Sequence, residues 1–276
     1  MTTQLLDIDA DSLADHFAET PFGVHHNLAD HELLSVEAVA QLAEKLPSER
    51  IEHNSGDIPA VVGDRAVDVV DEKPGDIARN IETNGSWMVL KNIELVPEYH
   101  RLLDETLDEV TPLVAGREGG MNLREGFVFL SAPNSTTPAH TDHEHNFLLQ
   151  IRGSKQMNIG RFRNSEAEQL HVEKMFAGQR NMDQLPDDPT AYELRPGDGV
   201  YVPPNAPHWV VNGPEVSVSL SITFRTPVTE RGAVVHSMNR RLRKLRISPR
   251  PPGEHLAVDK AKFAVHRTLK SLRRSQ

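Results

Sequence analysis

From Gly126 onward, apolar and polar residues alternate with a period of two, and this pattern restricts the possible folds more than any other feature of the chain. Successive side chains of an extended strand point to opposite faces, so short alternating segments indicate strands. The segments are FVFLSA, HTDH, FLLQI, SKQMNI, GVYVP, HWVVN and VSVSLSITF, and proline, asparagine and glycine separate them. Many short strands joined by turns predict a β-sandwich or barrel.

The N-terminal third shows helical periodicity instead. The first 60 residues are predicted to be helix and loop, with Ser35 capping a helix that ends before Pro47. Residues 74–83 predict a short helix, SWMVLKNI a strand, and Pro97 the start of a helix that runs to Gly116. The fold class predicted is therefore mainly β with α flanks.

We expect three regions along the 276 residues, which suffice for one good core and an appendage. Residues 1–120 form an N-terminal helical or mixed region that packs on the barrel. Residues 121–230 form the β core, and the polar segment 161–192 interrupts it as an insertion with a helix and a lid-like loop. Residues 231–276 form C-terminal helices, around 236–246 and 255–274.

The C-terminal region differs from the rest of the chain in charge. Residues 231–276 hold 13 Lys/Arg residues and two acidic residues, Glu254 and Asp259, so their net charge is +11. Because the whole chain has a net charge of −10, the other residues together carry −21. Its second helix has an apolar stripe, which suits a homodimer contact. The stripe consists of Val258, Ala261, Val265, Leu269 and Leu272. Nucleic acid is the disfavoured partner, because interleaved aromatic residues and nucleic-acid motifs are missing.

Composition excludes several classes of site. The chain has no cysteine, so disulfides, thiolate nucleophiles and Cys-based metal sites are ruled out, and a metal would have to rest on His, Asp and Glu. No apolar run approaches the roughly 18 residues needed to cross a bilayer, and the acidic start MTTQLLDIDADSLADHF is unlike a signal peptide. We expect a soluble cytoplasmic protein without membrane contact.

Candidate metal ligands lie in the alternating region. His140 and Asp142 would share one side of a strand, and His208 follows Asp142 by 66 positions. Two imidazoles and one carboxylate hold non-heme Fe(II) on one face and leave open positions for a co-substrate and O2. The pair His143 and His145 has the opposite phase and would, with His208, suit a different metal cupin. We favour His140, Asp142 and His208.

Lys155 adds an independent observation. Across the Arg152–Gly153 turn it shares phase with Met157 and Ile159, so it is predicted to face the apolar interior. A buried lysine needs an anion, and the far carboxylate of a dicarboxylate co-substrate on the iron would supply one. The alternative is that Lys155 lies at a strand end and reaches water.

At this point the chain resembles the Jumonji-C (JmjC) and cupin-like Fe(II)/2-oxoglutarate oxygenases, especially the asparaginyl-hydroxylase-like branch with its TPxHxD and NFxxQxxGxK motifs. The resemblance covers roughly Phe127 to Phe224. It implies a double-stranded β-helix (jelly-roll) core, iron on the three ligands named above, and Lys155 on the far carboxylate of 2-oxoglutarate. It further implies that Thr137 and Asn146 hydrogen-bond the co-substrate. Arg225, past the last strand, is a weaker candidate for the carboxylate partner and is interpreted as a surface charge.

The function that follows from the resemblance is hydroxylation of an unactivated C–H bond with Fe(II), 2-oxoglutarate and O2. The expected substrate is an amino-acid side chain of a peptide or protein, with a small metabolite as the second possibility. One rival hypothesis is a metal cupin of other chemistry that uses His143, His145 and His208. Another is a non-enzymatic binding or regulatory module that keeps the barrel and binds a partner through its basic tail.

Overall fold

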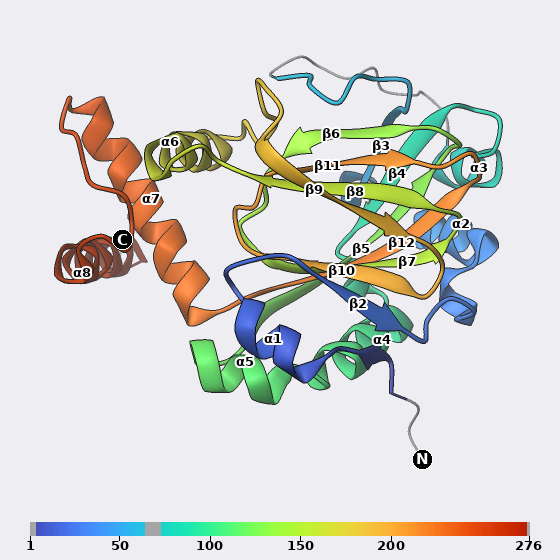
Figure 1. Ribbon diagram of the computed structural model, residues 1–276, viewed down its shortest axis with the longest axis horizontal. Coiled ribbons are helices and arrows are strands. Elements are labelled where there is room, and N and C mark those ends of the chain that lie inside the picture. The colour runs from blue at the N-terminus through green and yellow to red at the C-terminus, as the bar shows by residue number, and fades with distance from the viewer. Residues whose placement is uncertain (1–3, 64–72, 275–276) are drawn as a thin grey trace.

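Two antiparallel sheets face each other in the structure, a computed structural model that describes residues 4–63 and 73–274 (Figure 1). The larger sheet has the strand order β1 (Leu6–Asp7), β2 (Phe22–His26), β10 (Asp198–Val202), β7 (His145–Arg152), β12 (Ser217–Arg225), β5 (Asn122–Ser131), β4 (Ser86–Lys91) and β3 (Ile51–Ser55). The smaller sheet has the order β6 (Thr136–His140), β11 (His208–Asn212), β8 (Lys155–Arg161) and β9 (Asp187–Leu194). The predicted jelly-roll core is confirmed.

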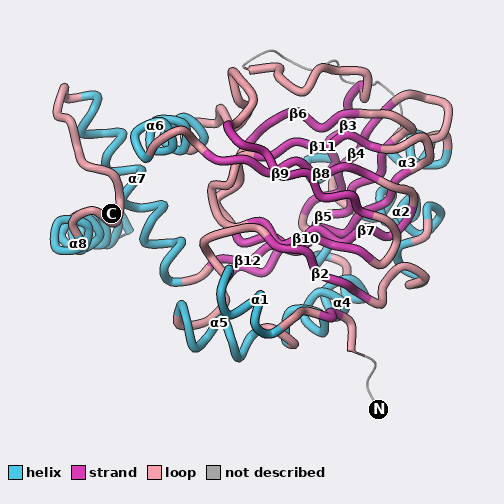
Figure 2. The backbone as a smooth tube through the Cα atoms, viewed as in Figure 1, coloured by secondary structure: helices cyan, strands magenta, loops and turns pink. Residues whose placement is uncertain are grey.

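Helices lie outside the two sheets (Figure 2). The N-terminal ones are α1 (Ala10–His16), η1 (Glu32–Leu34), α2 (Val36–Lys45), η2 (Ser48–Arg50), α3 (Pro74–Arg79), η3 (Ile93–Leu95), α4 (Pro97–Asp108) and α5 (Thr111–Glu118). The others are α6 (Ser165–Met175), α7 (Pro227–Lys244) and α8 (Leu256–Arg274), which gather beside one end of the barrel (Figure 1). Among the described residues, no helix is long and apolar enough to span a membrane.

Apolar and polar residues alternate along β12, so the two faces of this strand have different surroundings. Val218, Leu220, Ile222 and Phe224 are buried in the core that joins the larger sheet to α1–α5. The intervening Ser and Thr side chains lie on the opposite face of the strand. Ser221 and Thr223 line a cavity there together with Met157 and Val210 of the smaller sheet. One face of this strand therefore meets the hydrophobic core and the other meets the cavity.

Several helix boundaries follow from local chemistry. Ser35 Oγ accepts a hydrogen bond from Ala38 N at 3.2 Å, as predicted for the cap of α2. The single helix predicted from Pro97 to Gly116 is wrong, because the segment forms two helices, α4 and α5. Pro112 lacks an N–H and its ring would clash with the carbonyl four residues earlier, so a continuous helix cannot pass this point.

Four strands were not predicted, and each is short or exposed. The first 60 residues contain β1, β2 and β3 as well as helix and loop, and β9 begins within the segment 161–192 and ends at Leu194. Strands β3 and β9 pair with one neighbour each, so they are edge strands with little apolar alternation. Pairing with β4 and β8, which is a tertiary contact, decides their conformation. Helix α7 also begins at Pro227, earlier than the predicted 236.

Candidate metal centre and its cavity

The three predicted metal ligands meet where β6 ends and β11 begins. These strands pair so that His140 and His208 are opposite each other. Asp142 Oδ2 lies 3.5 Å from His140 Nε2 and 3.7 Å from His208 Nε2. One ligand atom from each residue falls within 4.8 Å of the others, and no other such group occurs in the described residues. The structure therefore places His140, Asp142 and His208 around one point.

Asp142 reaches this point by a route that differs from the prediction. Strand β6 ends at His140, so Asp142 lies in the following loop and not on the same strand face. Its carbonyl accepts a hydrogen bond from Asn205 N at 2.7 Å, and Thr141 N donates to Arg180 O at 3.4 Å. The strand-phase argument for the HxD pair is wrong. Contacts with two distant loops orient the carboxylate.

Both imidazoles present the same nitrogen to Asp142. His140 Nδ1 lies 2.7 Å from Pro138 O, and His208 Nδ1 lies 2.9 Å from Ala206 O. A carbonyl oxygen only accepts, so each Nδ1 carries the proton and each Nε2 keeps a lone pair for a ligand. Two such imidazoles and one carboxylate fit the donor set of a non-heme Fe(II) site with open positions.

The charge states also suit a metal. Burial, followed by the neighbouring His140, lowers the pKa of His208 to about 4, so the ring is neutral at neutral pH. Desolvation alone would raise the pKa of Asp142, but His140, Arg180 and His208 together hold it below its ordinary value. A neutral imidazole and an ionised carboxylate can bind a cation without first releasing a proton.

A cavity of about 280 Å³ extends from this cluster into the barrel. Lys155, the first residue of β8, lines it and is only 5% exposed, so the prediction that it faces the interior is confirmed. Burial lowers the pKa of Lys155 to about 7, and no acidic neighbour among residues 4–63 and 73–274 counters this effect. A buried amine in a cavity, without an acidic partner, is a site for a ligand anion.

Thr137 and Asn146 line the same cavity. Asn146 Oδ1 accepts a hydrogen bond from Ser221 Oγ at 2.8 Å, which leaves the amide nitrogen as the donor toward the cavity. Ser221 and Thr223 of β12 also line it. The structure thus brings the six residues singled out from the sequence to one cavity; their roles in binding remain predictions.

The rival histidine pair does not join them. His145 is fully buried and stacks on Phe17 and Phe224, with ring centroids 4.9 and 4.8 Å away. Its Nδ1 lies 2.8 Å from Tyr201 Oη and its Nε2 lies 3.1 Å from Glu118 Oε2. Both nitrogens are engaged in the outer core, so His145 is a packing residue.

Replacing His145 by alanine is expected to lower the free energy of unfolding by about 3 kcal/mol, because a buried aromatic ring is removed from a packed stack. The folded fraction should bind Fe(II) as the unchanged protein does. Urea denaturation and metal titration would measure the two effects. A variant of normal stability with lost metal binding would contradict the assignment of His145 to the core.

Several residues around the site were not found from the sequence. Arg180, in the loop after α6, has Nη1 3.7 Å from Asp142 Oδ1. Arg225 is half-buried and pairs with Glu144 at 2.6 Å, so its interpretation as a surface charge is wrong. No periodic pattern surrounds Arg180, and Glu144 lies in a loop, so only tertiary structure reveals these contacts.

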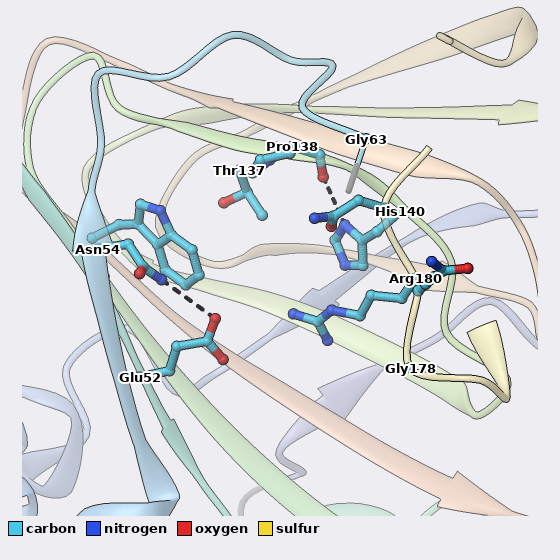
Figure 3. A pocket seen from close by; sticks show the side chains of 11 residues that line it. Glu52, Asn54, Gly63, Thr137, Pro138, His140, Gly178 and Arg180 are labelled. Carbon is cyan, nitrogen blue, oxygen red and sulfur yellow. Dashed lines mark hydrogen bonds between the residues drawn. The ribbon is translucent and has the colours of Figure 1, made fainter. Parts of the chain in front are cut away.

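An outer groove of about 460 Å³ adjoins the inner cavity and shares Trp87, Thr137, His140 and Arg180 with it. In Figure 3, Glu52 and Asn54 of β3 form one wall, and Arg180 extends from the facing loop toward them. Since the groove and the cavity share four residues, the metal centre can be reached from the surface along this path.

Three comparisons with known proteins agree with this geometry. The family described as JmjC domain matches residues 122–231. A stretch of 103 residues is 29% identical to Jumonji C domain-containing protein 5 of Drosophila melanogaster, covering 33% of this chain. The chain spans about a quarter of that fly protein, 26% of its length.

Solved structures of an Escherichia coli protein share the fold. The X-ray structure of ycfD has a TM-score of 0.56 at 18% identity, covering 97% of this chain and 68% of that chain. A structure of the E. coli ribosomal oxygenase YcfD in complex with cobalt and 2-oxoglutarate has a TM-score of 0.52 at 18% identity, covering 95% and 65%. The resemblance stated from the sequence is confirmed: residues 122–231 of this chain match the family described as JmjC domain, and the fold is shared with the E. coli structures.

Proposed function

We propose that this protein is an Fe(II)- and 2-oxoglutarate-dependent oxygenase that hydroxylates an unactivated C–H bond in an amino-acid side chain of a peptide or protein. One observation carries the proposal: the His140, Asp142 and His208 cluster shares a cavity with the buried amine of Lys155. The JmjC domain match supports it, as does the E. coli fold relative whose structure holds cobalt and 2-oxoglutarate.

Bound iron with 2-oxoglutarate would supply the oxidising chemistry: one atom of O2 enters succinate as CO2 leaves, and the other enters the substrate C–H bond. The chain's own residues hold and orient the reactants. His140 Nε2, His208 Nε2 and the Asp142 carboxylate would hold the metal. Lys155 would pair with the far carboxylate of 2-oxoglutarate, and Asn146 and Thr137 would donate hydrogen bonds to it.

The groove of Figure 3 supports a peptide substrate. Trp87 Nε1 is buried, lines the groove and has no acceptor among the described residues. Arg180 adds further donors, while Glu52 and Asn54 on the opposite wall offer acceptors. A peptide group needs both kinds of partner, because it carries one N–H and one carbonyl. A small metabolite is the alternative substrate.

The arrangement of the rest of the chain remains a prediction. The division into residues 1–120, 121–230 and 231–276 is proposed for the same reasons as before. We also propose that α8 takes part in a homodimer, since Leu256, Val258 and Val265 are 68%, 50% and 49% exposed on it. The side chains of Leu269 and Leu272 lie outside the described residues. Cytoplasmic location is likewise a proposal.

Anaerobic titration of Fe(II)-loaded protein with 2-oxoglutarate is expected to produce the weak visible absorption of an iron-chelated 2-oxo acid. Oxygen and a pool of tryptic peptides should then yield succinate and peptides heavier by one oxygen atom. A parallel pool of small metabolites distinguishes the two substrate classes. Iron binding without the absorption band, and without succinate, would favour a metal cupin of other chemistry or a binding module.

A further inference from the structure

A second cavity of about 430 Å³ lies between the barrel and helices α6, α7 and α8. It is separate from the groove and the inner cavity, because it shares no lining residue with either. Its barrel wall includes His143 and Asn205. Each belongs to a loop beside the metal centre: His143 follows Asp142, and Asn205 N donates to Asp142 O. The cavity thus lies behind the loops that position the metal ligands.

Four buried polar atoms that line this cavity have no hydrogen-bond partner in the described part of the chain. They are His143 Nε2, Gln169 Oε1, Asn205 Oδ1 and His236 Nδ1. Gln169 is 1% exposed and His236 7%, so bulk water does not reach them freely. Buried polar atoms are normally paired, so four unpaired ones around one space indicate a missing occupant.

These atoms are mainly acceptors. Gln169 Oε1 and Asn205 Oδ1 can only accept, and Gln169 Nε2 already donates to Glu173. His143 Nδ1 lies 3.3 Å from Glu144 Oε1, which places the proton on Nδ1 and leaves Nε2 as an acceptor. The occupant must therefore bring several N–H or O–H donors.

The charges favour a cation. Glu168 lines the cavity, its carboxyl group has no hydrogen bond or ion pair with the described residues, and burial raises the pKa of that group. Glu118 and Asp259 add two further carboxylates with partners of their own. Arg231 and Lys260 also line the cavity, but both are exposed, so solvent screens their charge.

The walls also suit a chain with apolar parts between its donors. Phe176 lies between the two histidines, with its ring 5.0 Å from that of His143 and 6.2 Å from that of His236. Unpaired polar atoms occur on α6, on α7 and on the barrel loops, and the three N–H groups of one ammonium cannot serve all four of them. Methylene groups would contact Phe176 and Val235, and ammonium groups near the ring gain cation–π attraction.

We propose that this cavity binds a linear polyamine cation, with one ammonium group near Glu168 and Gln169 and another near His143 and His236. The site would be distinct from the substrate groove. Its occupant would stiffen the loops that carry Asp142 and precede His208.

Calorimetric titration of the full chain with spermidine tests the proposal. Glu168→Gln is expected to weaken binding at least about tenfold, because it removes a charge-assisted hydrogen bond from a buried site. The matched control is Glu166→Gln, which removes the same charge from an exposed position of α6 and should leave the affinity unchanged. 1,4-Butanediol, an uncharged chain with two donors, should not bind.

A second variant keeps the test informative if Glu168→Gln fails to fold. His236→Phe keeps a ring in place and removes the unpaired ring nitrogen, so it should also weaken spermidine binding while circular dichroism stays unchanged. Absence of spermidine binding by the folded wild-type protein would overturn the proposal in favour of a water-filled cavity. Equal weakening by Glu168→Gln and Glu166→Gln would overturn it in favour of unspecific attraction to an acidic surface.

Discussion

Asp142→Ala is expected to reduce Fe(II) affinity by more than about a hundredfold and to abolish 2-oxoglutarate turnover. Residues that only orient metal ligands change affinity by about 10–100-fold when mutated, so loss of a ligand should exceed that range. Asp142 is the one carboxylate in the cluster of ligand atoms within 4.8 Å, and without it two neutral imidazoles face the metal alone. Calorimetry with Fe(II) or Co(II) measures the affinity, and succinate release measures the turnover.

The matched control for this change is Asp183→Ala. Asp183 lies in the same loop as Arg180, is exposed, and pairs with Lys174 at 3.1 Å on the surface. Its removal deletes an equal charge near the site but no ligand, so metal affinity should stay unchanged. If folded Asp142→Ala protein kept the wild-type metal affinity, the metal would have to bind elsewhere in the chain.

Lys155→Met is expected to raise the 2-oxoglutarate concentration needed for half-saturation by at least about thirtyfold. Loss of one partner of a buried charge pair weakens binding by about 2–5 kcal/mol, and 2 kcal/mol corresponds to about thirtyfold. Methionine fills similar space without a charge, so iron binding should persist. The change in absorption on anaerobic titration measures this affinity directly.

Lys91→Met is the informative comparison, because Lys91 also lines the inner cavity but is already paired with Glu52. A larger loss of 2-oxoglutarate affinity in Lys91→Met than in Lys155→Met would transfer the carboxylate-binding role to Lys91. Comparable small effects in both variants would argue that the co-substrate is not a dicarboxylate. The proposal requires that Lys155→Met lose clearly more affinity for 2-oxoglutarate than Lys91→Met does.

Because of Lys155, we expect both the free energy of unfolding and the affinity for 2-oxoglutarate to depend on pH. With a pKa of about 7 in the folded protein against 10.5 ordinarily, Lys155 holds fewer protons in the folded than in the unfolded chain between these values. The free energy of unfolding therefore rises with pH across this window. Binding a carboxylate requires the ammonium form, so affinity for 2-oxoglutarate should fall about tenfold for each pH unit above 7. Lys155→Met should show neither trend.

Local patterns in the sequence were enough to predict the core strands and the inward position of Lys155. Apolar and polar residues alternate in β12 because one face of the strand packs in the hydrophobic core and the other meets the cavity, which leaves a strong signal in the residues themselves. The identity of the metal ligands could also be proposed, because few residue types bind Fe(II) and the chain has no cysteine. The strand phase gave no valid reason for this choice, because Asp142 lies in the loop after β6 and not on a face of that strand.

The sequence by itself determined the class of fold, the jelly-roll strands and the set of candidate ligands, because these depend on side-chain periodicity and on donor chemistry. Only the tertiary structure decided how Asp142 reaches the site, that Arg180 lies beside it, and that a second polar cavity forms behind it. Each of these depends on loops and edge strands. Their conformation is set by hydrogen bonds to residues distant in the sequence, such as Asp142 with Asn205, and these leave no local pattern.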